Sequence, residues 1–406
     1  MRHLARTLLV IFVFSVPWEY SADLGAPWGN VSRLAGLVLL LAAIPAALQS
    51  GRMRMPGAMQ WLVLALYLWF CCTFFWSIDQ VVTLAKARAY FQEMIIVFLV
   101  WEFTGTALEL RVLLRAFLAG SWVLAILTLA DFRSPDSLAA VQFRFAAYGQ
   151  DPNDVARFLD LGFPFAALLA GAESPWSDRL LGLGYLPLGI AGVLLTASRG
   201  GFLAAAVALA GCALLLSREN PKALVAGFFA LPPLAAGLWI TIPRETFARL
   251  ATIPEQLRSG DLNQRLNIWT AGWQAFVHAP MLGSGAGTFV AAARLAANDT
   301  AHNTALSIAV GGGLVGLLLA SAILLSAVKM LLQTPGPVRM VFLLVLLVWI
   351  VTSLVGTVEE NRVTWLLFAM SAVVARLAEE SPAELAACFP DLPANPMQSA
   401  SAVLQS

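Results

Sequence analysis

The stretch HNTALSIAVGGGLVGLLLASAILLSAV, residues 302–328, contains no Asp, Glu, Lys or Arg. A helix that crosses the hydrocarbon core of a bilayer needs about 20 predominantly apolar residues. Residues 303–328 therefore predict a membrane-spanning helix. Just before it, between about Pro243 and Asn303, the apolar pattern is interrupted for roughly sixty residues. We expect the chemistry of the chain to lie where this polar segment meets the bilayer.

Apolar runs follow one another along nearly all of the remaining chain. Of the 406 residues, 59% are hydrophobic and 12% are charged, whereas about 25% are charged in soluble domains. The sequence therefore predicts an all-α polytopic membrane protein with about twelve transmembrane helices. The predicted spans are 4–17, 33–48, 58–76, 88–103, 111–130, 155–171, 180–197, 201–216, 222–242, 303–328, 338–357 and 363–378.

These spans also predict the organisation and orientation of the chain. The basic residues of the short loops place the N-terminus in the cytoplasm and both long loops in the periplasm or outside the cell. We expect membrane helices in 1–130, 155–242 and 303–378, a first long periplasmic loop in 131–154 and a large periplasmic loop with short amphipathic helices in 243–302. The proline-rich residues 379–406 are expected to form a disordered cytoplasmic tail.

Charge and metal-ligand patterns exclude several classes of function. The formal net charge is +1, so no overall positive field would recruit nucleic acid. The four Cys and three His do not occur at the spacings of metal sites. We therefore predict neither a metal nor another cofactor.

The segment TASRGG, residues 196–201, contains the first candidate site. Ser198 is a plausible N-cap, so Arg199 would stand beside the N-terminus of the next helix. An arginine at the end of a span is often only a topological anchor. Here the helix N-terminus and the guanidinium together could instead bind an anion, and a pyrophosphate at the membrane surface would suit that site.

The large polar segment contains a second candidate, Arg265. In QRLNIWTAGWQAF, Arg265, Trp269 and Trp273 fall at i, i+4 and i+8 on one face of a predicted helix. This helix would lie in the headgroup layer or belong to a small extramembrane core. Arg265 would gain a function by lying next to Arg199.

His302 stands where the long apolar helix begins. With Asp299 or Thr300 as the cap, the positive helix terminus would disfavour the imidazolium form. A neutral His302 could act as a general base, or it could only hydrogen-bond its own backbone. Gly311 to Gly313, further along the helix, are expected to permit close packing rather than to contact a ligand.

Two further polar segments flank predicted spans. In GTVEENR, Glu359 or Glu360 could orient His302 or hold an arginine, or both could be ordinary interfacial charges. In YGQDPNDVARF, we expect a turn at Asp151–Asn153 and a helix cap at Asp154. Arg144 and Arg157 are candidates for additional phosphate contacts.

Taken in order, four short motifs resemble the O-antigen ligase family. They are TASRGG at 196–201, R-x-x-x-W-x-x-x-W at 265–273, P-x-x-G-x-G-x-G-x-F at 280–289 and His302–Asn303. The resemblance covers roughly residues 145 to 365. It implies a glycosyltransferase of GT-C-like architecture in the bacterial inner membrane, inverting and independent of metal ions.

The resemblance also implies substrates and site residues. Such ligases take a glycan from undecaprenyl pyrophosphate and attach it to lipid A–core oligosaccharide in the periplasm. It assigns catalytic roles to His302, Arg199 and Arg265, and donor pyrophosphate binding to both arginines and Ser198. Supporting roles fall to Asn303 and to Glu359 or Glu360, although the family has aspartate at the acidic position.

Three alternatives stay open from the sequence. An O-antigen polymerase or an O-linked protein oligosaccharyltransferase of the same superfamily would share the donor chemistry and differ in the acceptor. A transporter of lipid-linked glycans would carry ionisable residues near the middle of the bilayer. The nearly uncharged spans disfavour a transporter, with Gln92 and Glu93 as the exception.

Overall fold

The computed structural model describes residues 1–25, 28–51, 53–134, 143–171, 174–219, 221–259, 264–296 and 299–390. Within these residues the chain is helical and contains no β-strand. The helices in chain order are α1 (Arg2–Ser15), η1 (Val16–Ser21), α2 (Val31–Ser50), α3 (Ala58–Cys72), η2 (Thr73–Phe75), α4 (Gln80–Phe103), α5 (Ala107–Phe132), α7 (Pro152–Leu169), α8 (Trp176–Leu195), α9 (Arg199–Glu219), α10 (Pro221–Thr241), α11 (Arg244–Ala251), α12 (Ile253–Ser259), α13 (Arg265–His278), α14 (Phe289–Ala292), α15 (Thr304–Gln333), α16 (Gly336–Ser353), α17 (Arg362–Glu380) and α18 (Pro382–Cys388).

Seven helices of the described chain are long and apolar enough to cross a membrane. They are Arg2–Ser21, Val31–Gln49, Ala58–Phe75, Ala107–Phe132, Trp176–Leu195, Thr304–Gln333 and Gly336–Ser353. A helix of the structure falls on each of the twelve segments expected from the sequence. The protein is therefore a multi-pass membrane protein, and the count of twelve spans stays a prediction.

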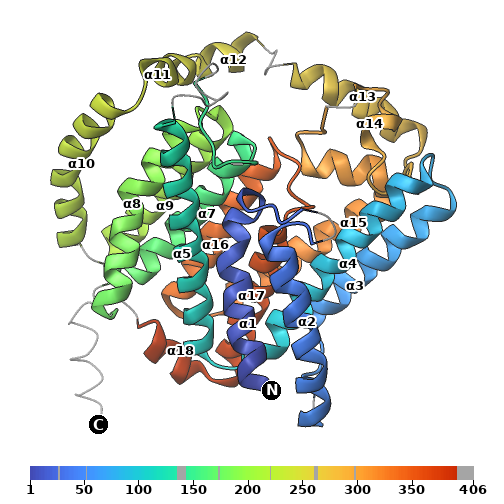
Figure 1. Ribbon diagram of the computed structural model, residues 1–406, viewed down its shortest axis with the longest axis horizontal. Coiled ribbons are helices and arrows are strands. Elements are labelled where there is room, and N and C mark those ends of the chain that lie inside the picture. Colours follow the sequence, from blue (N-terminus) through green and yellow to red (C-terminus); the bar gives the residue numbers. More distant parts are fainter. Residues whose placement is uncertain are drawn as a thin grey trace.

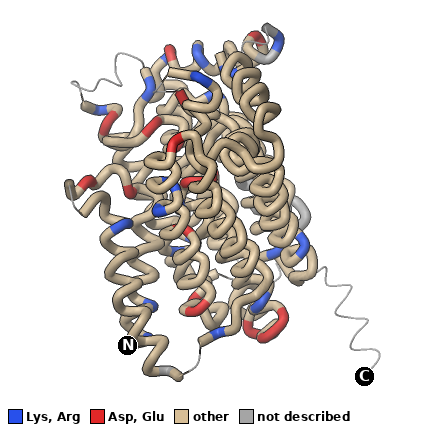
Figure 2. The backbone as a smooth tube through the Cα atoms, turned by 90° about the vertical axis from the view of Figure 1, so that its right-hand side faces the viewer, with Lys and Arg blue, Asp and Glu red and all other residues tan. Residues whose placement is uncertain are grey.

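The two ends of the helix bundle differ in what they carry. The N-terminus and α18 lie at the lower end in Figure 1, while α11 to α14 lie at the opposite, upper end. Figure 2 shows many charged residues in the upper part and long tan stretches of helix below it. We use "upper end" and "lower end" in this sense. The polar segment between α10 and α15 thus covers the end remote from the N-terminus.

The glycine-rich loop at 280–288 packs against a break in α15. Gly313 interrupts the helix with φ +65°, and the freed backbone groups pair with the loop. Ser284 N donates to Val310 O at 2.8 Å, and Leu314 N donates to Pro280 O at 2.8 Å. A Cβ on Gly313 would come within 2.3 Å of Met281 O. These glycines therefore permit close packing, as expected, and the partner is the backbone of a loop.

The expected disorder of the tail is wrong for its first residues. Residues 382–388 form α18, and Leu385 is buried. The Glu384 carboxylate accepts a hydrogen bond from Ala107 N, and Arg111 donates to Cys388 O. These contacts with α5 stabilise α18, and the local proline content could not reveal them. The rest of the expected tail, 391–406, lies outside the described residues.

Candidate functional site

The N-terminus of α7 provides the first part of the site. Asp151 caps this helix, because its carboxylate accepts from Asn153 N at 2.7 Å and Pro152 occupies the first helical position. The expected cap at Asp154 is therefore wrong: the helix begins one turn earlier, since proline suits the first helical position. Asp154 instead pairs with Arg157, one turn along the same helix.

The turn between α8 and α9 places Ser198 and Arg199. Ala197 adopts φ +49°, which reverses the chain. Ser198 Oγ accepts from Gly201 N at 3.2 Å, so Ser198 caps α9 as expected. The same hydroxyl donates to Asn153 Oδ1 at 2.9 Å, which joins this turn to α7. Arg199 is the first residue of α9.

Five arginines gather around these two helix termini, and we call them the arginine cluster: Arg144, Arg157, Arg199, Arg249 and Arg265. Hydrogen bonds fix several of them. Arg144 donates to Asn153 Oδ1 at 2.9 Å and Arg249 donates to Ala197 O at 3.2 Å. Arg199 Nη1 donates to Thr252 Oγ1 at 3.1 Å. The cluster thus combines α7, α9, α11 and α13 at the upper end.

Electrostatics show that members of the cluster act on one another. Burial, and then the charge of Arg199, lowers the pKa of Arg265. Burial, followed by the charges of Arg144 and Arg199, lowers the pKa of Arg249. Like charges brought together out of water are unfavourable unless an anion offsets them. Asp151 acts on the cluster in the opposite sense, since its charge raises the pKa of Arg265.

His302 lies in a bend immediately before α15, with φ +45°. Its Nδ1 is 3.2 Å from Thr300 Oγ1, within hydrogen-bonding distance. The helix cap is Asn303, whose Oδ1 accepts from Leu306 N at 2.9 Å. The expected cap at Asp299 or Thr300 is therefore wrong, because α15 begins at Thr304 and only Asn303 stands in the capping position. Thr300 is left to orient the imidazole.

The charge of the arginine cluster affects the pKa of His302. Burial lowers its pKa, and the charge of Arg265 lowers it further. This is the direction expected from the sequence, and the neutral form therefore dominates at pH 7. Asp151 and Asp299 act in the opposite sense. The charge of Arg199 thus acts on Arg265, and the charge of Arg265 acts on His302; we call these three residues the electrostatic unit.

Helix α13 holds this unit together. Arg265 is its first residue, and Trp269 Nε1 donates to Ala301 O at 3.1 Å, next to His302. Farther along, Ala275 packs with Phe289 and Val310 in a small buried cluster. Trp273, by contrast, is 59% exposed. The two indoles therefore differ. Trp269 anchors the segment that carries His302, and Trp273 faces the exterior of the protein.

Residues 184–321 match the model of the O-antigen ligase family. The resemblance drawn from the sequence motifs is confirmed over this range. The range contains Arg199, Arg265 and His302, but it covers only part of the chain. No curated protein matches the sequence.

The two glutamates expected to support the site have other partners. Glu360 forms an ion pair with Lys86 of α4. Glu359 is buried, and burial together with the charge of Glu360 raises its pKa to about 7. The side chain of Ser307 acts in the opposite sense and lowers that pKa. Asn303 is structural in part, since it caps α15 and donates to Leu354 O at 3.3 Å.

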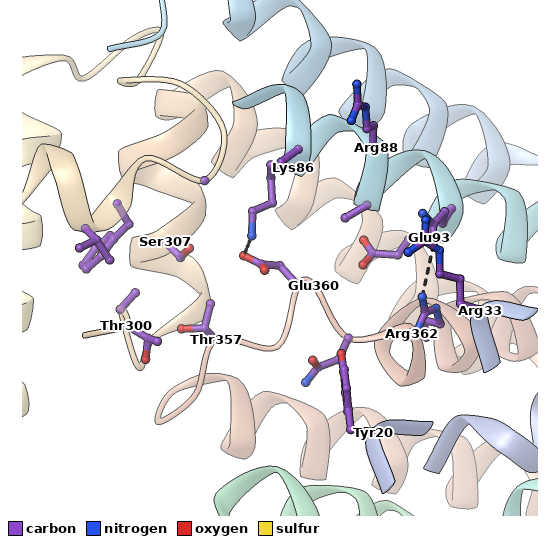
Figure 3. Close-up of a pocket in the computed structure, with 18 of the residues that line it drawn as sticks. Tyr20, Arg33, Lys86, Arg88, Glu93, Thr300, Ser307, Thr357, Glu360 and Arg362 are labelled. Carbon is purple, nitrogen blue, oxygen red and sulfur yellow. Dashed lines mark hydrogen bonds and ion pairs between the residues drawn. The ribbon is translucent and has the colours of Figure 1, made fainter. Parts of the chain in front are cut away.

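A polar cavity of about 710 Å³ adjoins the His302 segment away from the arginine cluster. Asp299, Thr300 and Ala301 form part of its wall, and α4 and the 357–362 segment form much of the rest. Figure 3 shows Thr300 and Ser307 on one side, Arg33 and Arg362 on the other, and Lys86 reaching Glu360 between them. None of the five clustered arginines lines this cavity.

Sequence reasoning missed several members of the site. Arg249 and Thr252 belong to α11 and the turn after it, in a polar segment without a distinctive motif. Asp151 was interpreted only as part of a turn, and Thr300 only as a cap. A usable signal was the spacing of Arg249 and Thr252, which places both near the end of one short amphipathic helix. Within the described residues, no three His, Cys, Asp or Glu side chains gather closely enough to hold a metal ion.

Proposed function

We propose that this protein is a glycosyltransferase of the lipopolysaccharide pathway that transfers a glycan from undecaprenyl pyrophosphate to lipid A–core oligosaccharide. The observation that carries this proposal is the electrostatic unit of Arg199, Arg265 and His302 at one end of a membrane bundle. All three residues lie in the range that matches the O-antigen ligase family. An arginine cluster beside a neutral histidine suits the departure of a pyrophosphate and the activation of a hydroxyl.

His302 is the general base in this mechanism. When Nδ1–H donates to Thr300 Oγ1, Nε2 carries the lone pair that accepts the proton of the acceptor hydroxyl. The acceptor oxygen then bonds to the anomeric carbon from the face opposite the pyrophosphate. The bond between that carbon and the pyrophosphate oxygen breaks with its electron pair, so the configuration inverts. The products are the glycosylated acceptor, undecaprenyl pyrophosphate and protonated His302.

Arg199 and Arg265 stabilise the leaving pyrophosphate. Negative charge grows on its oxygens as the bond to the sugar breaks, and planar guanidinium groups can donate two parallel hydrogen bonds to it. Ser198 caps α9, so the positive end of that helix adds to the field. Removing one such donor reduces the rate by roughly 10²–10³-fold in other enzymes. Arg144, Arg157 and Arg249 would contact the same phosphates.

The proposed location is the bacterial inner membrane, with the upper end facing the periplasm. The excess of basic residues in the short loops at the lower end supports this orientation. The architecture would then be GT-C-like, with the segment 243–302 as the large periplasmic loop. Undecaprenyl-linked glycan and lipid A–core would reach the site from the outer leaflet.

Reconstitution tests the proposal. Purified protein in liposomes would receive undecaprenyl-pyrophosphate glycan and lipid A–core in the presence of a chelator. We expect the glycan to appear on the lipid A–core, and His302→Ala to abolish the transfer. Transfer to a second lipid-linked glycan would reveal a polymerase, and transfer to a pilin-like protein would reveal an oligosaccharyltransferase. A strict requirement for a divalent cation would contradict the metal-independent mechanism.

A further inference from the structure

An apolar groove of about 320 Å³ lies between α2 and α4, and we call it the α2/α4 groove. Its wall is built largely from aliphatic and aromatic side chains of three helices, among them Leu9, Phe12, Leu37, Leu40, Ile95 and Leu99. The apolar part of this surface suits a hydrocarbon chain. Two of the three helices, α1 and α2, are among those long and apolar enough to cross a membrane.

The α2/α4 groove adjoins the polar cavity next to the His302 segment. Arg33, Gln92 and Arg362 line both of them, and we call their position the junction. Arg362 pairs with Glu19 and donates to Gln92 Oε1 at 3.2 Å, so its charge is already compensated. Arg33 is exposed and forms no ion pair with any described residue. A guanidinium is therefore available at the junction of the apolar groove and the polar cavity.

The polar cavity contains hydrogen-bonding groups that the chain itself does not satisfy. Glu93 is 3% exposed, and its Oε2 accepts no hydrogen bond from a described residue. Thr357 Oγ1 also lacks a partner among the described residues. Buried polar atoms without partners are rare, because each costs free energy. A ligand with hydroxyl groups would satisfy them.

We propose that the α2/α4 groove and the polar cavity together bind the acceptor as a phosphorylated glycolipid. One acyl chain lies in the groove, Arg33 binds a phosphate at the junction, and the sugar hydroxyls reach Glu93 and Thr357. This inference rests on the proposed function, which places the donor pyrophosphate at the arginine cluster. The acceptor then approaches His302 through the cavity that Thr300 lines, from the side away from the donor.

Two pairs of variants separate the charge of Arg33 from the shape of the groove. Arg33→Gln removes the guanidinium, and Arg244→Gln at the exposed start of α11 is its control. Leu37→Trp fills the groove. Leu41→Trp, one turn along α2, is its control, because Leu41 is 61% exposed and does not line the groove. Each variant is reconstituted in nanodiscs with lipid A–core, either phosphorylated or enzymatically dephosphorylated.

The readouts are the KM for the acceptor, the acceptor-independent hydrolysis of the donor, and the lipid retained in native mass spectrometry. Arg33→Gln should raise the KM for the phosphorylated acceptor roughly tenfold and leave that for the dephosphorylated one unchanged. Leu37→Trp should raise the KM for both acceptors and reduce the amount of lipid retained. Neither control should have these effects, and donor hydrolysis should be unchanged throughout.

Three results would overturn the inference. Arg33→Gln could affect both acceptors equally or neither, or Leu41→Trp could match Leu37→Trp. In discs that contain phosphatidylglycerol, retention of that lipid in place of the acceptor would identify the site as an ordinary phospholipid site. Failure of the proposed function is distinct, because wild-type protein would then transfer no glycan or His302→Ala would transfer as well as wild type.

Discussion

The two ends of the bundle differ in how some of their arginines are neutralised. At the lower end, arginines pair with carboxylates of neighbouring helices: Arg2 with Glu102, Arg6 with Glu109, Arg54 with Glu380, and Arg111 and Arg115 with Asp178. At the upper end Arg157 also pairs with a carboxylate, but burial and neighbouring arginines lower the pKa of Arg144, Arg249 and Arg265. None of these three forms an ion pair with a described residue.

This difference separates structural charge from functional charge. An arginine that faces a carboxylate joins helices and leaves little charge for a ligand. Arginines that face one another raise the free energy of the site until an anion binds. We therefore expect substitutions at the upper end to reduce the transfer rate and substitutions at the lower end to reduce stability.

The largest expected effect is that of His302→Ala. Removing a general base reduces the rate by roughly 10²–10⁴-fold, and the thermal midpoint should stay close to that of wild type because the imidazole is half-buried. Initial rates of glycan transfer measure the first effect, and thermal unfolding measures the second. His278→Ala, at the exposed end of α13, is the matched control. A loss of folded protein equal to the loss of rate would contradict a catalytic role.

At the lower end, Arg111→Ala should affect stability rather than chemistry. Asp178 is 2% exposed and lies between Arg111 and Arg115, with Arg111 Nε at 2.7 Å. Leaving a buried charge without a partner costs about 3–5 kcal/mol, and the loss here should be smaller because Arg115 still pairs with Asp178. Denaturation in lipid nanodiscs should show a loss of stability, to which the lost hydrogen bond from Arg111 to Cys388 O contributes. The kcat per folded molecule should be unchanged, and a lowered kcat in the folded fraction would contradict the comparison.

Arg199→Ala, at the upper end, should affect the transfer rate rather than stability. We expect a rate reduction of roughly 10²–10³-fold with little change in stability. Arg199→Lys should recover part of the rate, since it keeps the charge and loses the planar fork. Transfer rates at saturating donor, measured beside Arg244→Ala, provide the test. Full activity of Arg199→Ala would remove the arginine cluster from the mechanism.

The sequence predicted the positions of helices better than their details. Apolar length is a local property, so each expected span falls on a helix. Caps were less certain, because Asp151 and Asp154, or Asp299, Thr300 and Asn303, offer several capping side chains within a few residues. The contacts of α18 with Arg111 connect distant parts of the chain, and no local pattern encodes them.

The candidate site was foreseen only as far as its motifs reach. Ser198, Arg199 and His302 stand at helix termini, where sequence rules are strong. That Arg265 would lie near Arg199 was a hypothesis that needed the fold. Arg249 was not predicted, because a polar loop contains many arginines and only the path of α11 selects one.

The smallest expected effect is a shift in the acidic limb of the pH–rate profile. Only neutral His302 can accept a proton, so activity is present above its pKa and is lost as the pH falls through it. Burial, and then the charge of Arg265, lower this pKa from its usual value of about 6.5. Arg265→Gln removes the second cause, so the acidic limb should move upward in pH.

Histidine NMR in nanodiscs can measure this shift independently of the rate, because the chain has three His. The resonance of His302 should titrate at a higher pH in Arg265→Gln than in wild type. Arg244→Gln should leave the titration of His302 unchanged. Since Arg265 follows burial among the causes, the shift should fall short of restoring the ordinary value. An unchanged His302 titration would mean that the two side chains do not share one electrostatic site, and the contrast between the two ends would then rest on Arg199 and its neighbours alone.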